Sequence, residues 1–416
     1  MMIHAVADKK ITIKYNNTFI LFAIMMFIAE DYICFFDMKS RIYSLNTILL
    51  LVWGLYQSFA IKRIKHNVFP YDRLIFLYVL STLISCCMAT LINGEPLGYA
   101  LLGARQAFII MLYFPIKFIV NRYGREQITN IILKMGAIVA IALIVQSILY
   151  PQIVFINTVS NTRLGRYRTY YFMTITIFNI MFYFSKVFTQ KLKYKDIINL
   201  VLCFVAFVFV QQTKSAIIAV VMACLFVFII EMSKGKIRYK IIIILATSLL
   251  IYCGKNYLYG QYLEAIDTIN EAARTITGNV GIRIRTIEFI MDSVKNHSIF
   301  GLGYYYGGWD SSNYITGWAY GYAMGDVGFF QQLFHVGYVG LIISALILIK
   351  LTANIYKLDK KDNYLYFGKL ILIYMILVSV FNYYFTSDTM LVYLCIYMAI
   401  FDEPYNGGKQ KCNQKK

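Results

Sequence analysis

The sequence predicts an all-α integral membrane protein with about twelve transmembrane helices and a large extracytoplasmic loop between helices 9 and 10. Apolar residues make up 59% of the 416 residues, only 15% are charged, and the mean hydropathy is +0.61. Soluble domains carry roughly a quarter charged residues, so this composition excludes an ordinary soluble protein. The apolar residues also form separate runs, most of which approach the roughly 20 residues that a helix needs to cross a bilayer.

These runs are predicted to span the membrane in two groups. Those before the loop lie at residues 18–36, 45–61, 74–92, 100–120, 128–149, 170–188, 197–210, 216–230 and 241–257. Those after it lie at residues 327–349, 365–385 and 389–401. The seventh, eighth and twelfth runs are short. One helix does not continue through residues 197–230, however, because the polar sequence Gln-Gln-Thr-Lys-Ser at 211–215 favours a hairpin between two spans.

Lys and Arg residues orient the predicted bundle. With the N-terminus inside, the short cytoplasmic segments hold 26 Lys and Arg residues, against six in the short exterior loops. This excess follows the positive-inside rule, so we expect both termini in the cytoplasm and the long loop outside. The net charge of +19 is then a consequence of topology, and it does not indicate binding to nucleic acid.

The predicted organisation has four parts. A membrane domain with helices 1–9 occupies residues 1–253, the extracytoplasmic loop residues 254–326, helices 10–12 residues 327–401, and a cytoplasmic tail residues 402–416. Residues 1–17 lack the apolar core of a cleavable signal peptide, so the first span is expected to be an uncleaved anchor. His297 is the only histidine of the loop, and the exterior segments contain no cluster of metal ligands. We therefore expect no metal and no cofactor.

Several cations lie where this topology places the exterior face. Arg105 is about one turn inside the outer end of the fourth span, where an arginine either faces the bundle interior or snorkels outward. Arg163, Arg166 and Arg168 lie in the exterior loop after the fifth span, where contact with lipid headgroups is the alternative to a functional role. Lys214 lies at the outer tip of the hairpin, where lysine is commonly just solvated. All five are candidates for binding an anionic substrate.

The polar segment 281–303 is the most informative part of the long loop. A predicted helix there has one side formed by Arg283, Ile287, Ile290, Met291 and Val294, and another that carries Arg285, Glu288 and Asp292. An unbroken helix from Arg283 to His297 would separate the two by about 21 Å at 1.5 Å per residue. Either the helix breaks near Asn296 and His297 turns back, or the two residues bind different parts of an extended ligand. A capping or surface role is the ordinary alternative for this histidine.

The stretch from Arg283 to Gly303 resembles the signature of the O-antigen polymerase and ligase superfamily. In that family an arginine precedes, by one short helix, a His-Pro-Leu/Ile-Phe-Gly-Val/Leu-Gly element in a large periplasmic loop. The element here is His-Ser-Ile-Phe-Gly-Leu-Gly at residues 297–303, with Ser298 in place of the usual proline. Residues 325–341 are similar to the family's segment at the start of the next span, although Asp326 stands where a His-Asn pair is common. Thr-Lys-Ser at 213–215 is similar to a Ser-Arg step at the head of a family helix.

The resemblance implies a polysaccharide repeat-unit polymerase of the bacterial cytoplasmic membrane that makes O-antigen or capsule at the outer face. The donor would be an oligosaccharide on undecaprenyl diphosphate, and the acceptor a sugar hydroxyl. Arginine pairs with phosphate oxygens through two parallel hydrogen bonds, which suits Arg283 to the leaving diphosphate. His297 is the expected general base. The substrate-binding set would be Arg105, Arg163, Arg166, Arg168, Lys214, Arg285 and Asp326. Membrane lipids, a chain-length regulator and a flippase are the other implied partners.

Two other functions fit the same sequence. A ligase of the same superfamily would transfer finished glycan onto a lipid core or a protein. A lipid-linked oligosaccharide flippase, or another twelve-span transporter, belongs to a different class and is commonly built from pseudo-symmetric halves. The large loop after the ninth span divides the bundle unequally and carries the motif, which favours the enzyme. The sugar, its linkage and the acceptor are not encoded in any pattern that we recognise.

Single-cysteine labelling tests the predicted topology, in a background from which the eight native cysteines have been removed. We expect Ser311→Cys to react with a membrane-impermeant maleimide on intact cells, and Asn363→Cys to react only after permeabilisation. Labelling of position 311 solely after permeabilisation would overturn the orientation and, with it, the exterior site.

Overall fold

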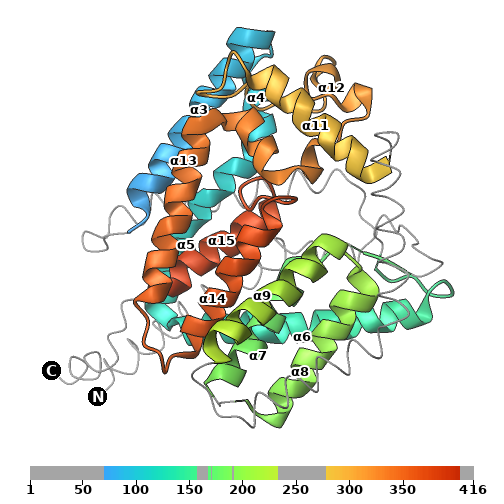
Figure 1. Cartoon of the computed structure of the whole chain (residues 1–416), viewed down its shortest axis with the longest axis vertical. Coiled ribbons are helices and arrows are strands. Elements are labelled where there is room, and N and C mark those ends of the chain that lie inside the picture. The colour runs from blue at the N-terminus through green and yellow to red at the C-terminus, as the bar shows by residue number, and fades with distance from the viewer. Residues whose placement is uncertain (1–69, 157–166, 170, 190–191, 233–277, 403–416) are drawn as a thin grey trace, which may run out of the picture.

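The structure of the chain is a computed structural model that describes residues 70–156, 167–169, 171–189, 192–232 and 278–402 (Figure 1). These residues form helices and connecting segments, with no β-strand among them. The predicted spans at 18–36, 45–61 and 241–257 lie outside the described residues, as do Arg163, Arg166 and most of the tail.

Six helical stretches within this part of the chain are long and apolar enough to cross a membrane. They are Asp72–Asn93 (α3), Leu97–Tyr123, Arg125–Leu149 (α6), Tyr194–Gln211, Lys214–Glu231 and Gly328–Tyr356 (α13). Shorter apolar helices occur at Met173–Phe188 (α7), Asn363–Val378 (α14) and Asp388–Phe401 (α15). Each of these stretches coincides with a predicted span, so the chain has the helical architecture expected of a membrane protein.

Three of the stretches are composite or belong to a longer element. The second consists of α4 (Leu97–Gly103), a 3₁₀ helix η2 (Ala104–Leu112) and α5 (Tyr113–Tyr123). The fourth consists of α8 (Tyr194–Val205) and a π-helical turn η3 (Ala206–Gln211), and the fifth is part of α9 (Lys214–Met232). The helix ends at the expected place, because Gln212 between these two stretches has the left-handed backbone conformation that terminates a helix. Pro115 follows η2 by three residues, and its missing N–H and fixed φ disturb regular α-helical bonding upstream.

The predicted loop contains helices of its own. The described part holds α11 (Gly278–Val294), α12 (Ser312–Ile315) and two 3₁₀ turns, η4 (Trp318–Tyr320) and η5 (Met324–Asp326). In Figure 1 these elements lie together beside the end of α3 that leads into α4.

Two predicted boundaries were wrong. The sixth span was predicted from residue 170, but α7 begins at Met173, directly after Phe172 adopts a positive φ of 62°. The eleventh was predicted to continue to residue 385, but α14 ends at Val378. The following carbonyls accept hydrogen bonds from the start of α13 instead, Ser379 from Phe329 N at 3.2 Å and Phe381 from Gly328 N at 3.1 Å. Hydropathy alone does not reveal that these carbonyls accept hydrogen bonds from another helix.

Helix α13 is broken at Gly337, and residues 298–303 of the loop fill the break. Gly337 has φ 62° and ψ −165°, so the helical hydrogen bonds around it are interrupted. The carbonyls of Phe334 and His335 accept from Leu302 N and Gly303 N, at 2.8 and 3.2 Å. On the other side of the break, the N–H groups of residues 338 and 339 donate to the carbonyls of residues 298 and 299, at 2.8 and 3.1 Å. The backbone groups released by the kink are thus satisfied by the loop.

Glycines allow this close approach of two backbones. A Cβ at Gly301 would lie 2.6 Å from the Phe334 carbonyl oxygen, and a Cβ at Gly337 would lie 2.4 Å from Gly301 N. Gly303 has a φ of 105°, and a Cβ there would lie 2.6 Å from the carbonyl oxygen of Ser85 in α3. The Gly-Leu-Gly sequence therefore packs the loop between α3 and α13, and it is protein backbone that approaches these glycines.

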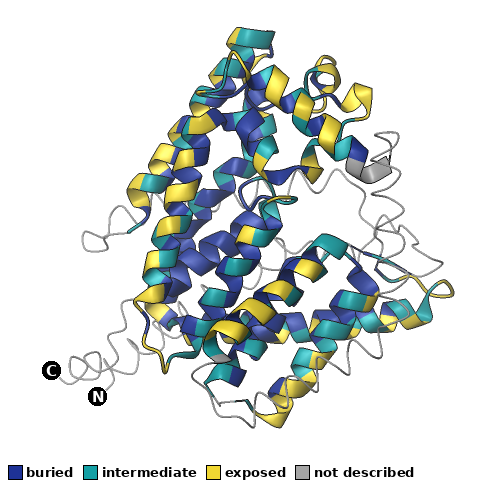
Figure 2. Cartoon of the chain, viewed as in Figure 1, coloured by how far each residue is buried: buried dark blue, intermediate teal, exposed yellow. Residues whose placement is uncertain are grey.

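Helix α15 forms the centre of the molecule. Every residue from Met390 to Phe401 is buried (Figure 2). It packs against α5 and η2 on one side and also contacts α13, α14 and α7. Helix α14 in turn packs against α7 and α9. Because α15 is covered by protein, its 14 residues need not match the full thickness of a bilayer on a lipid-facing surface.

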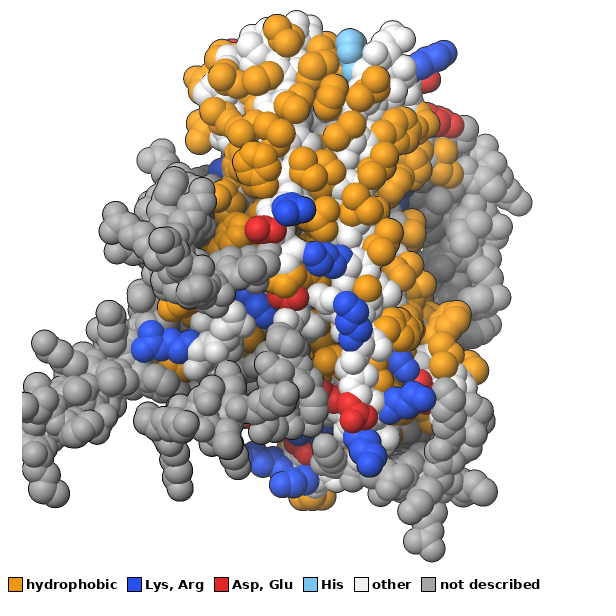
Figure 3. Space-filling model, turned by 90° about the vertical axis from the view of Figure 1, so that its left-hand side faces the viewer, with side chains coloured by type: hydrophobic (Ala, Val, Ile, Leu, Met, Phe, Trp, Pro, Cys, Tyr) orange, Lys and Arg blue, Asp and Glu red, His pale blue; other side chains and the backbone are white. Residues whose placement is uncertain are grey.

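Apolar side chains also cover part of the outside. Figure 3 shows hydrophobic side chains over the upper part of one face, with Lys and Arg side chains mainly below them. The exposed apolar residues of α3 and α13 include Phe76, Leu80, Leu91, Ile342 and Ile349. In water such a surface would be a liability, whereas it is the expected lipid-facing surface of a membrane helix.

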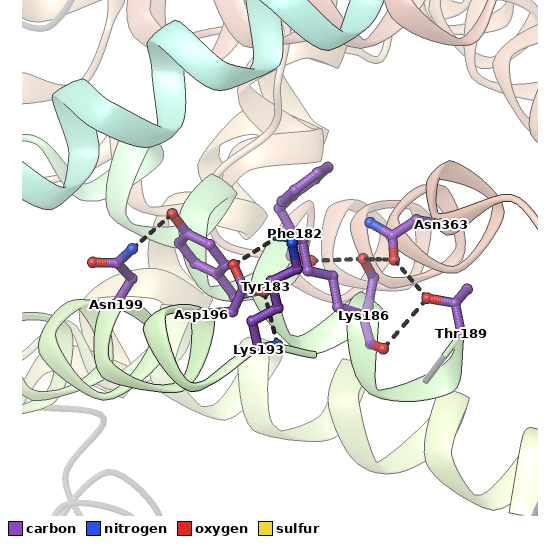
Figure 4. A network of polar contacts seen from close by, with 9 residues as sticks. Phe182, Tyr183, Lys186, Thr189, Lys193, Asp196, Asn199 and Asn363 are labelled. Carbon is purple, nitrogen blue, oxygen red and sulfur yellow. Dashed lines mark hydrogen bonds and ion pairs between the residues drawn. The ribbon is translucent and has the colours of Figure 1, made fainter. Parts of the chain in front are cut away.

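Polar contacts join segments that the charge pattern assigns to the same side. Among those expected inside, Arg125 pairs with Asp362, and Lys117 pairs with Asp402 at 3.1 Å. Figure 4 shows another such group, in which Lys186 of α7 pairs with Asp196 of α8 at 2.8 Å. Nearby, Asn363 at the start of α14 accepts from Ser185 of α7 and from Thr189, the residue directly after α7. These contacts fix the α7–α8 corner and the start of α14 relative to one another.

Substitution of Gly337 tests the importance of the break. We expect Gly337→Ala to lower the thermal unfolding midpoint in detergent, because a residue with a Cβ in this backbone region costs on the order of 1–3 kcal/mol before any steric clash. Gly325→Ala is the matched control, since nothing lies within 4 Å of a Cβ there and the residue is exposed. Equal midpoints for the two variants would contradict the proposed role of the break.

Candidate functional site

A polar pocket of about 250 Å³ lies next to the loop that fills the break in α13. Four segments form its walls: residues 103–107 at the start of η2, residues 304–307 of the loop, Gln331 and His335 of α13, and residues 385–386 between α14 and α15. Residues 298–303, which bond to α13 and pack on α3, thus position the loop that forms one wall of the pocket. Of the residues predicted from the sequence to bind substrate, Arg105 lines it.

Arg105 is the cation of this pocket. The 3₁₀ turn places its half-buried side chain beside Leu102, whose carbonyl accepts a 2.7 Å hydrogen bond from Nη1. Its Nε is buried and has no hydrogen-bond partner among the described residues. Asp388, the first residue of α15, is close enough to interact electrostatically with the guanidinium. An arginine with an unused buried donor can bind an anionic ligand at little extra desolvation cost.

His335 faces the same pocket from α13. Its Nδ1 lies 2.8 Å from the carbonyl oxygen of Gly303, and its ring stacks on Tyr304 with centroids 4.5 Å apart and planes at 5°. Ser85 of α3 donates to the His335 carbonyl. A carbonyl oxygen only accepts, so Nδ1 carries the hydrogen, and the neutral ring keeps its lone pair on Nε2.

A buried glutamate fixes the loop wall of the pocket from the other side. Glu95, in the turn between α3 and α4, accepts a 2.9 Å hydrogen bond from Tyr306 N, while its Oε2 is buried without a partner in the described part of the chain. Asn93 donates to the hydroxyl of Tyr305 at 2.5 Å. Burial raises the pKa of Glu95, and the hydrogen bond from Tyr306 N offsets part of this rise.

Arg283 lies beside the pocket rather than in its wall. Helix α11 turns it toward the start of α13, where Nη2 is 3.4 Å from Asp326 Oδ2 and the guanidinium lies 5.3 Å from the centre of the Phe381 ring. Its Nε is also buried without a partner among the described residues. Phe381 and the pocket residues Phe385 and Thr386 belong to one segment, residues 379–387, that separates α14 from α15. That segment therefore contacts Arg283 through Phe381 and lines the pocket of Arg105 through Phe385 and Thr386.

The two predicted sides of α11 are largely present. Ile290 and Val294 are buried and Arg283 and Ile287 half-buried, but Met291 is exposed, contrary to its expected place on the apolar side. Arg285, Glu288 and Asp292 are exposed as expected. Arg285 therefore lies on the surface, away from the wall of the pocket.

His297 occupies a turn after α11. The helix ends at Val294, close to the predicted break, and His297 N then donates to the Val294 carbonyl at 2.9 Å. The carbonyl of His297 accepts from Gly301 N at 2.9 Å, so the residue shapes the turn that precedes the break in α13. Its half-buried side chain is not among those that line the pocket. No hydrogen bond or ion pair joins it to Arg283 within the residues described.

The other predicted cations lie elsewhere. Lys214 begins α9, and Arg168 lies in the short described segment 167–169 before α7. A 3.0 Å hydrogen bond from Gln211 Nε2 to the Tyr171 carbonyl joins the segments that carry them. Neither residue lines the pocket. The described structure therefore brings together Arg105 with His335, and Arg283 with Asp326, but not the whole predicted set.

Sequence reasoning missed His335 and Glu95. The histidine lies within the tenth predicted span, and the glutamate is one residue in a short connection. A signal existed in both cases, because an ionisable residue within or at the end of an apolar span is expensive and usually functional.

Comparisons with known proteins add no family. We find no match to the chain among protein-family models or among curated proteins. Within the described residues, no group of three or more His, Cys, Asp or Glu side chains is arranged to hold a metal ion.

The raised pKa of Glu95 predicts a pH-dependent stability. A carboxyl whose pKa is higher in the folded state contributes stability below its unfolded pKa, and loses it as the pH rises through the folded value. We expect the thermal midpoint to fall as the pH rises above about 4.3, the ordinary pKa of a glutamate, and Glu95→Gln to reduce this fall. The exposed Glu288→Gln is the control and should behave as the parent protein does. If the thermal midpoint of Glu95→Gln falls with pH as much as that of the parent protein, burial of the Glu95 carboxyl is not the cause of the fall.

Proposed function

We propose that this protein is a membrane glycosyltransferase that polymerises polysaccharide repeat units at the outer face of the bacterial cytoplasmic membrane, using an undecaprenyl-diphosphate-linked donor. The observation that carries the proposal is the pocket in which Arg105 meets the loop that follows the His-Ser-Ile-Phe-Gly-Leu-Gly element. The apolar helices supply the membrane setting, and the resemblance in residues 283–303 suggests the reaction.

The arrangement of the arginines supports a diphosphate as the bound group. Residues 379–387 contact Arg283 through Phe381 and share the pocket lining with Arg105 through Phe385 and Thr386, and each arginine has a buried Nε without a partner in the described structure. A diphosphate offers two phosphoryl groups, and guanidinium groups bind such oxygens with two directed hydrogen bonds each. During transfer, negative charge grows on the leaving diphosphate, and fixed cations in a site of low dielectric constant stabilise it.

The ion pair between Arg283 and Asp326 can be displaced by an anionic ligand. At 3.4 Å, and with both side chains partly exposed, this ion pair is weak, so an incoming anion can replace the carboxylate at little cost. Asp326 then holds the guanidinium in position in the absence of donor. This role fits its place in the substrate-binding set.

Gln106, Gln331 and Thr386 suit the pocket to a sugar. The side-chain amides of both glutamines have no hydrogen-bond partner among the described residues, and each offers donors and an acceptor. Tyr304 and Tyr305 add aromatic surface to the same wall. A ligase would use the same donor pocket, so polymerase and ligase differ in the acceptor, which the pocket alone does not select.

Arginine variants test the proposal with the purified protein in nanodiscs. The substrate is the lipid-linked repeat unit extracted from a strain that lacks the gene. We expect Arg105→Ala and Arg283→Ala to reduce elongation by at least about 100-fold, because the charge on the leaving group is no longer stabilised. Lysine at either position should restore only part of the activity, since one ammonium does not reproduce a bidentate fork.

Lys295→Ala is the matched control, because Lys295 is an exposed cation of the same loop and contacts neither the pocket nor Asp326. Polymer of normal length from the Arg105→Ala protein would remove the pocket from the mechanism. A deletion strain that accumulates no lipid-linked repeat unit, and still makes polymer, would refute the function itself.

A further inference from the structure

We propose that His335 is the general base that removes the proton from the acceptor hydroxyl. This inference rests on the proposed function, and it assigns a catalytic role to a residue of α13 that the sequence motif does not include. The motif histidine, His297, is the competing candidate. The two differ in position, because His335 lines the pocket that contains Arg105, whereas His297 does not.

The tautomer of His335 is set by its surroundings. Nδ1 donates to the Gly303 carbonyl at 2.8 Å, which leaves Nε2 as the unprotonated nitrogen. Nε2 has no hydrogen-bond partner among the described residues, so it is available to a ligand in the pocket. Stacking on Tyr304 at 4.5 Å fixes the plane of the ring. A base oriented in this way loses little entropy when the acceptor arrives.

The charges around His335 favour the neutral ring at rest. Of the residues that line the pocket, Arg105 is the charged one, and no carboxylate is among them. Asp388 is associated with Arg105 outside the lining. A positive neighbour opposes a second proton on the imidazole, so the group is present in the form that accepts a proton.

The transfer step can be written completely with these groups. The acceptor oxygen forms a bond to the anomeric carbon of the donor while its proton moves to Nε2 of His335. The bond between the anomeric carbon and the diphosphate oxygen breaks, and its electron pair stays on the diphosphate, beside Arg105. The imidazolium then returns its proton to water, which restores the neutral base. No additional reactant is needed.

His297, by contrast, has a structural setting. Its backbone closes two hydrogen bonds of the turn between α11 and residues 298–303, which supports the break in α13. Substitution of this side chain should therefore affect activity only through the stability of the turn. Replacement of His335 should slow turnover without weakening donor binding, whereas replacement of His297 should lower activity only as far as it destabilises the turn.

Asparagine is the informative replacement at position 335. Its Nδ2 can take the place of Nδ1 and donate to Gly303, but nothing replaces Nε2. We expect His335→Asn to bind the lipid-linked repeat unit within about threefold of the parent protein and to elongate it about 10²- to 10⁴-fold more slowly, the usual contribution of a general base. His297→Asn tests the competing candidate and should lose less turnover than His335→Asn, whereas Lys295→Ala, at an exposed residue outside the pocket, is the control.

Chemical rescue gives a second measurement that does not depend on the asparagine variant. Added imidazole should restore turnover to His335→Ala, because it can occupy the vacated space and accept the proton, and it should not accelerate His297→Ala. Elongation by His335→Asn at close to the parent rate, or rescue of His297→Ala alone, would overturn the assignment. If the parent protein itself does not elongate the repeat unit, the proposed function fails instead, so the two failures are distinguishable.

Discussion

The hydrogen bonds between residues 298–303 and the break in α13 are the interaction on which the rest of the structure depends. A helix interrupted at Gly337 inside a membrane would leave backbone groups unpaired, at a cost of several kilocalories per mole for each group in hydrocarbon. The loop satisfies the groups around the kink, and in doing so it is fixed to α13 and, through Gly303, to α3. The positions of Tyr304 and His335 in the pocket follow directly from this attachment.

Helix positions were predictable from the sequence, because length and apolarity are local properties of a span. The break at Gly337 was not, since a glycine in an apolar run ordinarily stays helical and its φ here depends on a partner segment more than thirty residues away. The end of α14 was missed for the same reason, because Ser379 and Phe381 bond to α13. Arg105 was identified because a charge in an apolar span is conspicuous. His335 was overlooked because a single imidazole in such a span resembles ordinary packing.

The cations of the chain divide into two kinds that a count of charges does not separate. Arg125 and Lys117 are buried against the carboxylates of Asp362 and Asp402, so their charges are compensated and they join helices to one another. Arg105 and Arg283 have weaker or more distant acidic neighbours and each retains a buried donor without a partner in the described structure. The closeness of the acidic partner is therefore what separates the two kinds of cation, which location on the exterior side does not.

The walls of the pocket come from parts of the chain that are synthesised at very different times. Residues 103–107 enter the membrane early, whereas residues 385–386 follow roughly 280 residues later, a delay on the order of 15–60 s at ordinary rates of translation. During that interval Arg105 is already inserted, but neither α13 nor the segment after α14 exists. An immature chain therefore has no complete pocket. Ligand binding in this pocket is therefore a property of the finished molecule alone.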